Sequence, residues 1–398
     1  MRIKVAILFG GDSVEHEVSI ISAIQAMNAC DNNKYEVIPL YISKQRDFYY
    51  FHRIPEASQF RSLEEVMHKN PNVVLVKKGN TVCIEPVNRG LFAKTLNTID
   101  IAIPIMHGTN GEDGSIQGLL EMLKIPYAGC DVIAAACGQD KVVMKHILQN
   151  SGLPICPWTW IYGHQLEEKE SDIFQRVMEL GYPVIIKPAC LGSSVGIAVV
   201  HNESELKEKI KEAAQYDNKV VIEKMVDNLR EVNCSVLGSV FGCQASVLEE
   251  VSKGDNEILD YEKKYLAGGK SGKSKGANLP SKGASKSAGM ASTARIVPAP
   301  ISKEETDLIQ KLAVKTFEML GASGVCRIDF MMDDKTKAIY VNEINTIPGS
   351  LAFYLWKEEG MDFTALMEAL IQQVIARQRQ REKMITSFDS NILSNYNG

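Results

Sequence analysis

Apolar runs alternate with helical patterns over the first third of the chain. Residues 3–9 form a continuous apolar run that ends at two glycines, and residues 18–27 carry apolar side chains at helical spacing. A second apolar run, residues 101–106, ends at His107 and Gly108. Uninterrupted apolar runs are typical of strands that are buried on both faces. The pattern therefore predicts an α/β domain with a Rossmann-like parallel sheet over residues 1–138, with ligands at the carboxyl ends of its strands.

The pattern starts again near residue 139, which predicts a second domain over residues 139–223. Its first element is a helix over residues 141–150 that ends before Gly152 and Pro154. Asn202 and Glu205 have the spacing of a capping box, in which each side chain bonds a backbone N–H at a helix start. The other expected elements are strands at 183–187 and 220–223 and a helix from Asn202 to about 216.

Residues 224–398 have α+β character and form the third predicted domain. Strands are expected at 233–237 and 245–248, and a helix is expected from Ser302, with Glu305 as its capping partner, to Gly321. Between them, residues 260–290 are rich in glycine, serine, alanine and lysine and cannot build a core. This segment is expected to be a mobile loop, either a surface insertion or a lid whose lysines approach phosphates. The polar tail after 382 is expected to fray.

A polar hairpin follows that helix and carries the strongest chemical signal of the chain. Arg327 and Asp329 share one strand face, and so do Glu343 and Asn345, because side chains alternate along a strand. A turn near residues 335–336 places Asp329 opposite Glu343. Two carboxylates and an amide oxygen suit Mg²⁺ bound with nucleotide phosphates, and an arginine suits an anionic oxygen. The alternative is a solvated strand edge.

Composition narrows the possible partners and the compartment. The formal net charge is −5, which argues against a nucleic-acid or membrane-surface partner. Nine cysteines occur without a C-x-x-C pair, as expected for reduced and mostly buried thiols of a cytoplasmic protein. No stretch reaches the roughly 18 apolar residues of a membrane span.

Two further motifs in the middle of the chain fit a nucleotide. Lys187 ends a strand and precedes a loop of small residues up to Gly196, whose backbone N–H groups suit a phosphate. The order of residues is not that of a P-loop, and an ordinary turn is the alternative. Lys141 is another possible phosphate contact. Glu223 and Glu231, at the junction of the second and third domains, can accept bonds from an adenine amine and a ribose hydroxyl, or can be surface glutamates.

The first domain contributes groups that fit an amino acid. Residues 107–118 contain four glycines directly after a strand, as expected for a tight loop close to a ligand. His107 stands at the lip of this loop and can meet a carboxylate. Glu15, after the glycines of the first strand, can hold an ammonium. Together they offer an amino acid one partner of each sign.

Taken together, these motifs resemble D-alanine:D-alanine ligases of the ATP-grasp superfamily. The resemblance rests on H-G-T-N-G-E-D-G-S-I-Q-G from residue 107, K-P-A-C-L-G-S-S-V-G from 187, D-Y-E-K-K-Y at 260–265, R-I-D-F from 327 and N-E-I-N from 342. It implies that the second and third domains clamp ATP. It also implies that one D-alanine is phosphorylated on its carboxylate and that the amine of a second D-alanine then displaces the phosphate, for peptidoglycan precursor synthesis. No Ser-His-Asp order or catalytic-cysteine signature competes with this interpretation.

The resemblance assigns roles to individual residues. Two Mg²⁺ ions, which Mn²⁺ can replace, are expected on Asp329, Glu343 and Asn345. Arg327 and the Gly349 amide are expected to stabilise the oxyanion of the tetrahedral intermediate, and Lys264 the transferring phosphate. Tyr265 is expected to bond with Ser193 and Glu15 and close the site, with Glu15 holding the first ammonium. The implied ATP ligands are Lys141, Lys187, Ser193, Ser194, Val195, Glu223, Glu231 and Asn342.

The acceptor pocket departs from the family pattern. Tyr354 occupies the position at which a serine that binds the carboxylate of the second substrate is expected, and Ser350 is the alternative. Tyr265 favours D-alanine over D-lactate as acceptor. Rival functions are ligation of D-alanine to D-serine or another small amine, an ATP-dependent carboxylase such as a biotin carboxylase, and a non-catalytic nucleotide sensor. The family also implies a homodimer.

Overall fold

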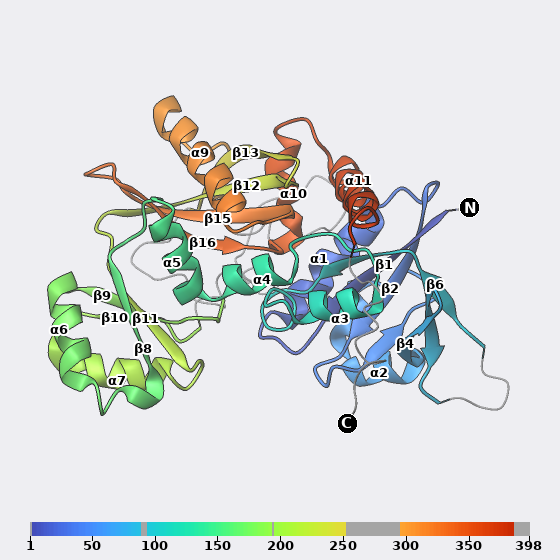
Figure 1. Ribbon diagram of the computed structural model, residues 1–398, viewed down its shortest axis with the longest axis horizontal. Helices are drawn as coiled ribbons and strands as arrows, with labels where there is room; N and C mark the ends of the chain where they lie inside the picture. Colours follow the sequence, from blue (N-terminus) through green and yellow to red (C-terminus); the bar gives the residue numbers. More distant parts are fainter. Residues whose placement is uncertain (1, 89–93, 193–194, 252–294, 386–398) are drawn as a thin grey trace, which may run out of the picture.

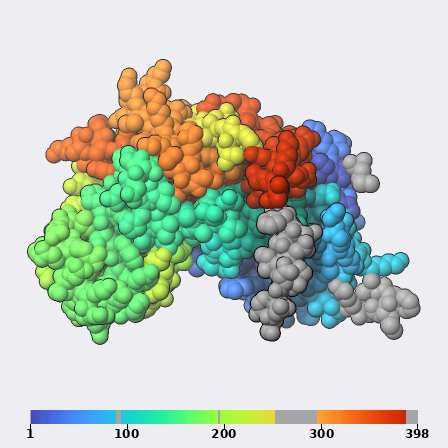
Figure 2. Space-filling view, viewed as in Figure 1, coloured from blue at the N-terminus to red at the C-terminus, as the bar shows by residue number. Residues whose placement is uncertain are grey.

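The computed structural model describes residues 2–385 except 89–93, 193–194 and 252–294. It contains three sheets in three lobes (Figure 1), which pack against one another in the space-filling view (Figure 2). The Lys-rich segment 260–290 and the tail beyond 385 lie outside the described residues, so the predictions made for them stay predictions.

The N-terminal lobe is built on a seven-stranded sheet of order β6-β5-β4-β3-β2-β1-β7. The parallel arrangement holds only for β2-β1-β7, whereas the strands from β3 to β6 pair antiparallel. The physical reason is visible between β4 and β5, whose two-residue connection permits only antiparallel pairing. The elements are β1 (Ile3–Gly10), α1 (His16–Ala29), β2 (Tyr35–Ile42), β3 (Phe48–Tyr50), η1 (Ala57–Arg61), α2 (Leu63–Lys69), β4 (Asn72–Lys78), β5 (Thr81–Pro86), β6 (Asn97–Ile99), β7 (Ile101–Ile105) and α3 (Ser115–Leu123).

The second lobe is a four-stranded antiparallel sheet of order β10-β9-β11-β8 with two helices against one face (Figure 1). Its core joins apolar residues of the strands to Ile173 and Val177 of α6 and to Leu206 and Ile210 of α7. The elements are β8 (Trp158–Tyr162), η2 (Gly163–Gln165), α6 (Glu170–Leu180), β9 (Val184–Pro188), β10 (Ala198–Val200), α7 (Glu203–Ala213) and β11 (Lys219–Lys224).

The third lobe is a five-stranded antiparallel sheet of order β14-β13-β12-β15-β16. Its core also takes Ala134 and Ala135 of α4 and Met144 and Leu148 of α5, so these two helices pack on the third lobe. The elements are α4 (Val132–Gln139), α5 (Lys141–Asn150), β12 (Leu229–Ser239), β13 (Gly242–Val251), β14 (Arg295–Ile296), α9 (Lys303–Met319), β15 (Gly324–Asp333), β16 (Ile339–Asn345), η4 (Gly349–Ala352), α10 (Phe353–Lys357) and α11 (Phe363–Arg381).

Local sequence signals located several elements correctly. The helix predicted over 141–150 is α5 with the same bounds. The capping box of Ser302 and Glu305 is present at the start of α9. At α7, Asn202 caps the helix, but Glu205 accepts from the backbone N–H of His201 and from the Asn202 side chain. The domain boundaries at 138 and 223 stay predictions.

Candidate active site

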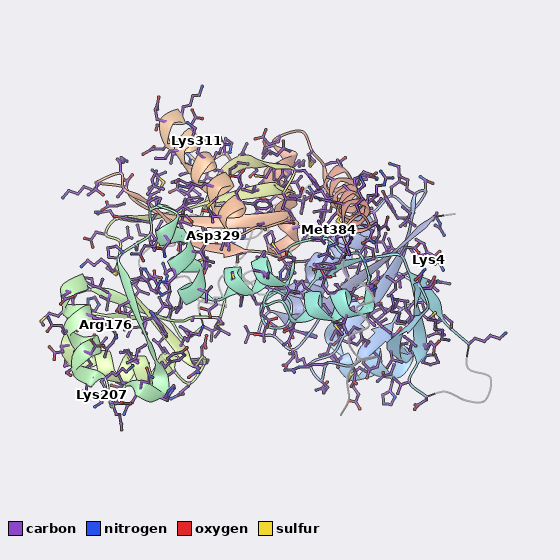
Figure 3. All side chains as sticks on the ribbon, viewed as in Figure 1. Lys4, Arg176, Lys207, Lys311, Asp329 and Met384 are labelled. Atoms are coloured by element: carbon purple, nitrogen blue, oxygen red, sulfur yellow. The ribbon has the colours of Figure 1, made fainter. Side chains whose placement is uncertain are left out.

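The predicted hairpin forms, and its polar residues meet on one face of the third sheet. Asp329 lies opposite Glu343, and Arg327 lies opposite Asn345. The Arg327 guanidinium donates two hydrogen bonds to the Asp329 carboxylate, from Nε to Oδ1 at 2.6 Å and from Nη2 to Oδ2 at 2.8 Å. Asn345 Nδ2 donates to Asp329 Oδ2 at 3.1 Å. Figure 3 shows Asp329 on the sheet of the third lobe. The side chains of Arg327 and Asp329 are only 14% and 16% exposed, so this face is not a solvated edge.

A bulge next to Asp329 turns a further side chain toward this face. The pairing of β15 with β16 shifts between Asp329 and Phe330, which leaves Asn342 as the extra residue. Asn342 Oδ1 accepts a 3.2 Å bond from Lys187 Nζ of the second lobe. The bulge thereby connects the strand that carries Glu343 with the lysine predicted to contact phosphate.

Lys187 also belongs to a buried ionic triad. Its Nζ lies 3.0 Å from Glu223 Oε2, and Lys145 Nζ lies 3.0 Å from Glu223 Oε1. Burial would raise the pKa of Glu223, but the two ammonium groups outweigh it and lower that pKa to about 2. The triad keeps one net positive charge at its core, which suits the phosphates of a nucleotide.

Lys145 was missed by the sequence reasoning. Its side chain is fully buried, although a lysine on a helix usually reaches solvent. The signal was its i,i+4 spacing from Lys141, which places both lysines on one side of α5. Lys141 Nζ lies 3.3 Å from Glu343 Oε2 and donates to the carbonyl of Leu191 at 3.1 Å. Thus α5 presents one lysine to Glu223 and one to Glu343.

The predicted ammonium partner lies where loops of the first two lobes approach each other. Glu15 precedes α1 and is 9% exposed. A Cβ atom on Gly108 would lie 2.9 Å from Glu15 Oε2, and one on Gly192 would lie 3.4 Å from it. Glycine is needed at Gly108 also because its φ is +71°. The loop after β7 and the loop after Lys187 therefore both border Glu15.

Residues 107–112 hold the segment that leads to Gly349. His107 Nδ1 donates to the carbonyl of Ile347 at 2.7 Å, and Glu112 accepts from the Ile347 N–H at 2.7 Å. Burial lowers the pKa of His107, so its ring is neutral at neutral pH. Burial and the nearby Glu15 carboxylate raise the pKa of Glu112 to about 7. Both ring nitrogens of His107 form hydrogen bonds with protein groups, so His107 helps to position residues 346–349. The contact of His107 with substrate stays a prediction.

Ser22 of α1 completes this arrangement. The neutral His107 ring carries its proton on Nδ1, which donates a hydrogen bond to the Ile347 carbonyl. Nε2 is therefore an acceptor, and the Ser22 hydroxyl donates to it at 2.9 Å. Ser22 Oγ in turn accepts the Ser350 N–H at 2.9 Å. These bonds fix an unfavourable turn, since Ser350, Leu351 and Ala352 all have φ of 50–53°. Left-handed backbone costs roughly 1–2 kcal/mol per non-glycine residue, and surrounding contacts must stabilise it.

Replacing Ser22 by alanine is therefore expected to lower kcat about tenfold and to leave KM for ATP unchanged. The change removes the acceptor of the buried Ser350 N–H, at a cost of about 1–3 kcal/mol, and loosens the turn beside Gly349. Steady-state kinetics measure both constants. Ser58→Ala, an exposed serine of η1, is the control. Unchanged kcat in Ser22→Ala would remove Ser22 from the positioning of Gly349.

The two candidates for the acceptor pocket have different surroundings. Ser350 is buried and its hydroxyl donates to Gln25 Oε1 at 2.6 Å. The Tyr354 hydroxyl donates to Glu249 Oε1 at 2.9 Å and contacts Arg295. Ser350 is thus committed to the contact with α1, while Tyr354 belongs to a charged group on the sheet face.

Of the remaining predicted site residues, the structure describes Val195 and Glu231. Ser193, Ser194, Lys264 and Tyr265 lie outside the described residues. Val195 lies in the turn that follows, and its backbone N–H donates to the carbonyl of Gly192 at 3.4 Å. Glu231 lies two residues before Asn233 on β12, on the face that carries Asp329.

The donor set fits a hard divalent cation. Asp329 and Glu343 supply facing carboxylates, and Asn345 adds an amide oxygen, as Mg²⁺ prefers. Each carboxylate contacts a cationic side chain, Arg327 or Lys141. Among the residues that the structure describes, no group of three His, Cys, Asp or Glu side chains could hold a metal. The two carboxylates therefore need the amide and oxygen atoms from outside the protein to complete a metal site.

Family models match most of the chain. The model described as "D-ala D-ala ligase N-terminus" matches residues 4–130, and that described as "D-ala D-ala ligase C-terminus" matches residues 147–372. The chain belongs to the D-alanine–D-alanine ligase family. The resemblance inferred from the motifs is confirmed, as is the ATP-grasp fold class. The chain is a ligase of this family, and such a ligase uses ATP and a divalent metal ion.

Similar proteins cover nearly the whole chain. It is 37% identical over 384 residues to a D-alanine–D-alanine ligase of Thermoanaerobacter sp. (strain X514), covering 95% of this chain and 98% of the relative. A D-alanine–D-alanine ligase of Thermosipho melanesiensis is 36% identical over 395 residues, with 98% of both chains covered.

Solved structures of family ligases share the fold. The D-alanine-D-alanine ligase from Coxiella burnetii has a TM-score of 0.76 at 26% identity and covers 96% of both chains. The VanG D-Ala:D-Ser ligase from Enterococcus faecalis has the same score and identity, covering 94% of this chain and all of that one. Two solved family members thus differ in the acceptor that their names state, although their folds match this chain equally well.

Two expectations from composition can be compared with the structure. All nine cysteines are free thiols and six of them are buried, as predicted. Within residues 2–385 and outside the three undescribed segments, no helix has the length and hydropathy needed to cross a membrane.

Proposed function

We propose that this enzyme joins two D-alanine molecules to D-alanyl-D-alanine for peptidoglycan precursor synthesis, at the expense of ATP. The observation that supports this most is the face on which Arg327, Asp329 and Asn345 meet Glu343, next to Lys187 and Asn342. Such a face combines metal-binding oxygens with cations for phosphate. A cytoplasmic location fits an enzyme that consumes ATP and carries nine free thiols.

The proposed reaction has two steps. The carboxylate of the first D-alanine, its ammonium held by Glu15, attacks the γ-phosphate of ATP, ADP leaves and D-alanyl phosphate forms. The neutral amine of the second D-alanine then attacks the acyl carbon, and inorganic phosphate and a proton leave as the amide forms. Arg327 and the Gly349 N–H stabilise the oxyanion, and the bonds from His107, Glu112 and Ser22 fix the Gly349 segment. Catalysis is then mainly positioning and charge stabilisation.

The same proposal assigns residues to the metal ions and to ATP. Asp329, Glu343 and Asn345 would hold two Mg²⁺ ions, for which Mn²⁺ can substitute. When bound, the metal neutralises charge that develops on the transferred phosphoryl group. Lys141, Lys187, Ser193, Ser194 and Val195 would contact phosphates, with Glu231 at the ribose. The triad geometry supports a role for Glu223 in holding Lys187, in addition to the predicted contact with adenine. Lys264 and Tyr265 keep the roles that the family resemblance implies.

The test is phosphate release from MgATP with D-alanine alone, with products identified by mass spectrometry. D-Alanyl-D-alanine formed with D-alanine as the sole amino acid is the expected result. Phosphate release only after addition of D-serine or D-lactate would reject the proposed acceptor and retain the ligase mechanism. ATP binding without any amino-acid-dependent phosphate release would reject catalysis.

D-Serine is the second candidate acceptor. The observation that favours it is the environment of Tyr354, which bonds Glu249 and contacts Arg295. A charged, hydrogen-bonding pocket accommodates an acceptor with a hydroxyl at low cost. Competition between D-alanine and D-serine in one reaction distinguishes the two by product mass.

We also propose that the enzyme is a homodimer. Apolar side chains on the adjoining helices α3 and α4 face solvent, with Met122 83% and Ile133 72% exposed. Large apolar side chains exposed on neighbouring helices are candidates for contacts between proteins. Light scattering is expected to give twice the chain mass of 44.0 kDa, and Met122→Glu with Ile133→Glu is expected to give monomers. A wild-type monomer would contradict the proposal, and the exposed Met178→Glu on α6 is the control.

A further inference from the structure

A charged group at the edge of the third sheet lies outside the roles assigned so far. Arg295 begins β14 opposite Val251, and Glu249 lies two residues earlier on β13. Because side chains alternate along strands, Arg295 and Glu249 share a face. Across the sheet, Glu249 is opposite Asn233, and Asn233 is opposite Asp329. The group is therefore on the same face as the proposed metal site. Glu249 is two strand spacings, about 10 Å, from Asp329, and Arg295 is one strand farther away.

The Arg295 guanidinium is held in one orientation. Its Nη1 contacts the Tyr354 hydroxyl and lies 3.2 Å from Glu249 Oε2. The guanidinium carbon stacks 4.9 Å from the centre of the Tyr354 ring. Glu249 is fully buried and also accepts from Asn233 Nδ2 at 2.9 Å. The arginine side chain itself is only 14% exposed.

One donor of this guanidinium lacks an acceptor in the described part of the chain. Arg295 Nε is buried and has no acceptor among the residues that the structure describes. The other arginines of this sheet differ, since Arg327 directs Nε and Nη2 to Asp329, and Arg230 directs the same two atoms to Glu250. That edge of a guanidinium matches a carboxylate, which can take two parallel bonds. A buried donor without an acceptor is costly, so a carboxylate from a ligand would satisfy it.

The position of the group indicates which carboxylate this is. The nucleotide side of the sheet is β16, with Asn342 and Lys187, whereas Arg295 is on β14 at the opposite edge. The ammonium partner of the first amino acid, Glu15, belongs to the N-terminal lobe. Tyr354 is five residues after Gly349, the proposed oxyanion donor. In the proposed reaction the carboxylate of the first amino acid becomes the acyl phosphate, so the free carboxylate left for this arginine is that of the acceptor.

We propose that Arg295 determines acceptor specificity by binding the carboxylate of the second amino acid through its Nε side, with Tyr354 and Glu249 holding the guanidinium. This inference rests on the proposed function. A charge-assisted pair of bonds of this kind is worth about 10- to 100-fold in selectivity.

The experiment compares an acid with its amide as acceptor. D-Alanine and D-alaninamide compete in one reaction with MgATP, and mass spectrometry gives the ratio of D-alanyl-D-alanine to D-alanyl-D-alaninamide. Arg295→Gln is expected to lower this ratio at least tenfold relative to wild type, with KM for ATP unchanged. Arg295→Lys, which keeps the charge but not the fork, is expected to give an intermediate ratio.

The matched control is Arg230→Gln. Arg230 lies on β12 next to Glu231, so its side chain is on the face of the sheet opposite to that of Asp329. Arg230→Gln removes the same charge as Arg295→Gln and also breaks a pair with a glutamate. An acid-to-amide ratio unchanged in Arg295→Gln, or lowered equally in Arg230→Gln, would overturn the inference. A wild-type enzyme that makes no D-alanyl-D-alanine would instead overturn the proposed function. The acid-to-amide ratio for whichever acceptor it uses would then still decide the role of Arg295.

Discussion

Replacing Asp329 by asparagine is expected to lower kcat about 1000-fold. The change removes a carboxylate charge from the proposed metal site and replaces one of the two oxygens that accept from Arg327 Nε and Nη2 with an amide NH2 group. Burial alone would lower the pKa of Arg327, but the Asp329 carboxylate raises it well above its usual value, so the pair is strongly coupled. Loss of metal binding costs several kcal/mol of transition-state stabilisation, and each 1.36 kcal/mol is a factor of ten in rate.

The matched control for Asp329 is Asp334→Asn in the turn of the same hairpin. Asp334 is half exposed and pairs with Lys337 and Arg230, so its loss is expected to change kcat less than twofold. Phosphate release at saturating MgATP measures both variants, and a titration with Mn²⁺ shows whether the apparent metal affinity falls. Near-normal turnover of Asp329→Asn would remove Asp329 from the metal site.

Replacing Lys145 by methionine is expected to destabilise the second lobe by about 3 kcal/mol. Methionine keeps most of the side-chain volume but leaves Glu223, which is 1% exposed, with a single cation. Breaking a buried pair by removing one partner typically costs about 3–5 kcal/mol. KM for ATP is expected to rise as well, because Glu223 positions Lys187. Fluorescence of Trp158 and Trp160 on β8 reports urea unfolding of this lobe.

The pH dependence of the Lys145 variant distinguishes an ionic effect from loss of packing. The native pKa of Glu223 is about 2, below its ordinary value of 4.5. Glu223 therefore contributes stability that is fully present above pH 4.5 and is lost as the pH falls toward 2. Removing Lys145 raises the native pKa, so stability is expected to fall less steeply over this range. Lys211→Met, which removes an exposed pair with Glu167, is the control. An equal slope in wild type and Lys145→Met would contradict the ionic role.

The polar hairpin and the starts of several helices follow from local patterns. Period-two alternation and the turn residues at 333–337 are enough to pair the two strands as far as Phe330 and Val341, because a hairpin has a single register for a given turn. The bulge at Asn342 then brings Glu343, instead of Asn342, opposite Asp329. Capping residues set the starts of α5 and α9, since they bond backbone groups within a few positions. These features involve neighbours in the chain, so the sequence determines them.

Contacts between distant segments were decided by the tertiary structure. The bulge at Asn342, the buried Lys145 and the bonds from Ser22 to His107 and Ser350 join residues that are 78 (Lys145 to Glu223) to 328 (Ser22 to Ser350) positions apart. No local pattern encodes which buried lysine meets which glutamate. The environment of Tyr354 is the clearest case: the sequence identified an unexpected tyrosine, and only packing placed Glu249 and Arg295 around it. The motifs of the sequence were enough to identify the family and to predict the reacting groups. Burial and sheet packing decided which partners hold these groups, since contacts between distant residues depend on the assembled fold.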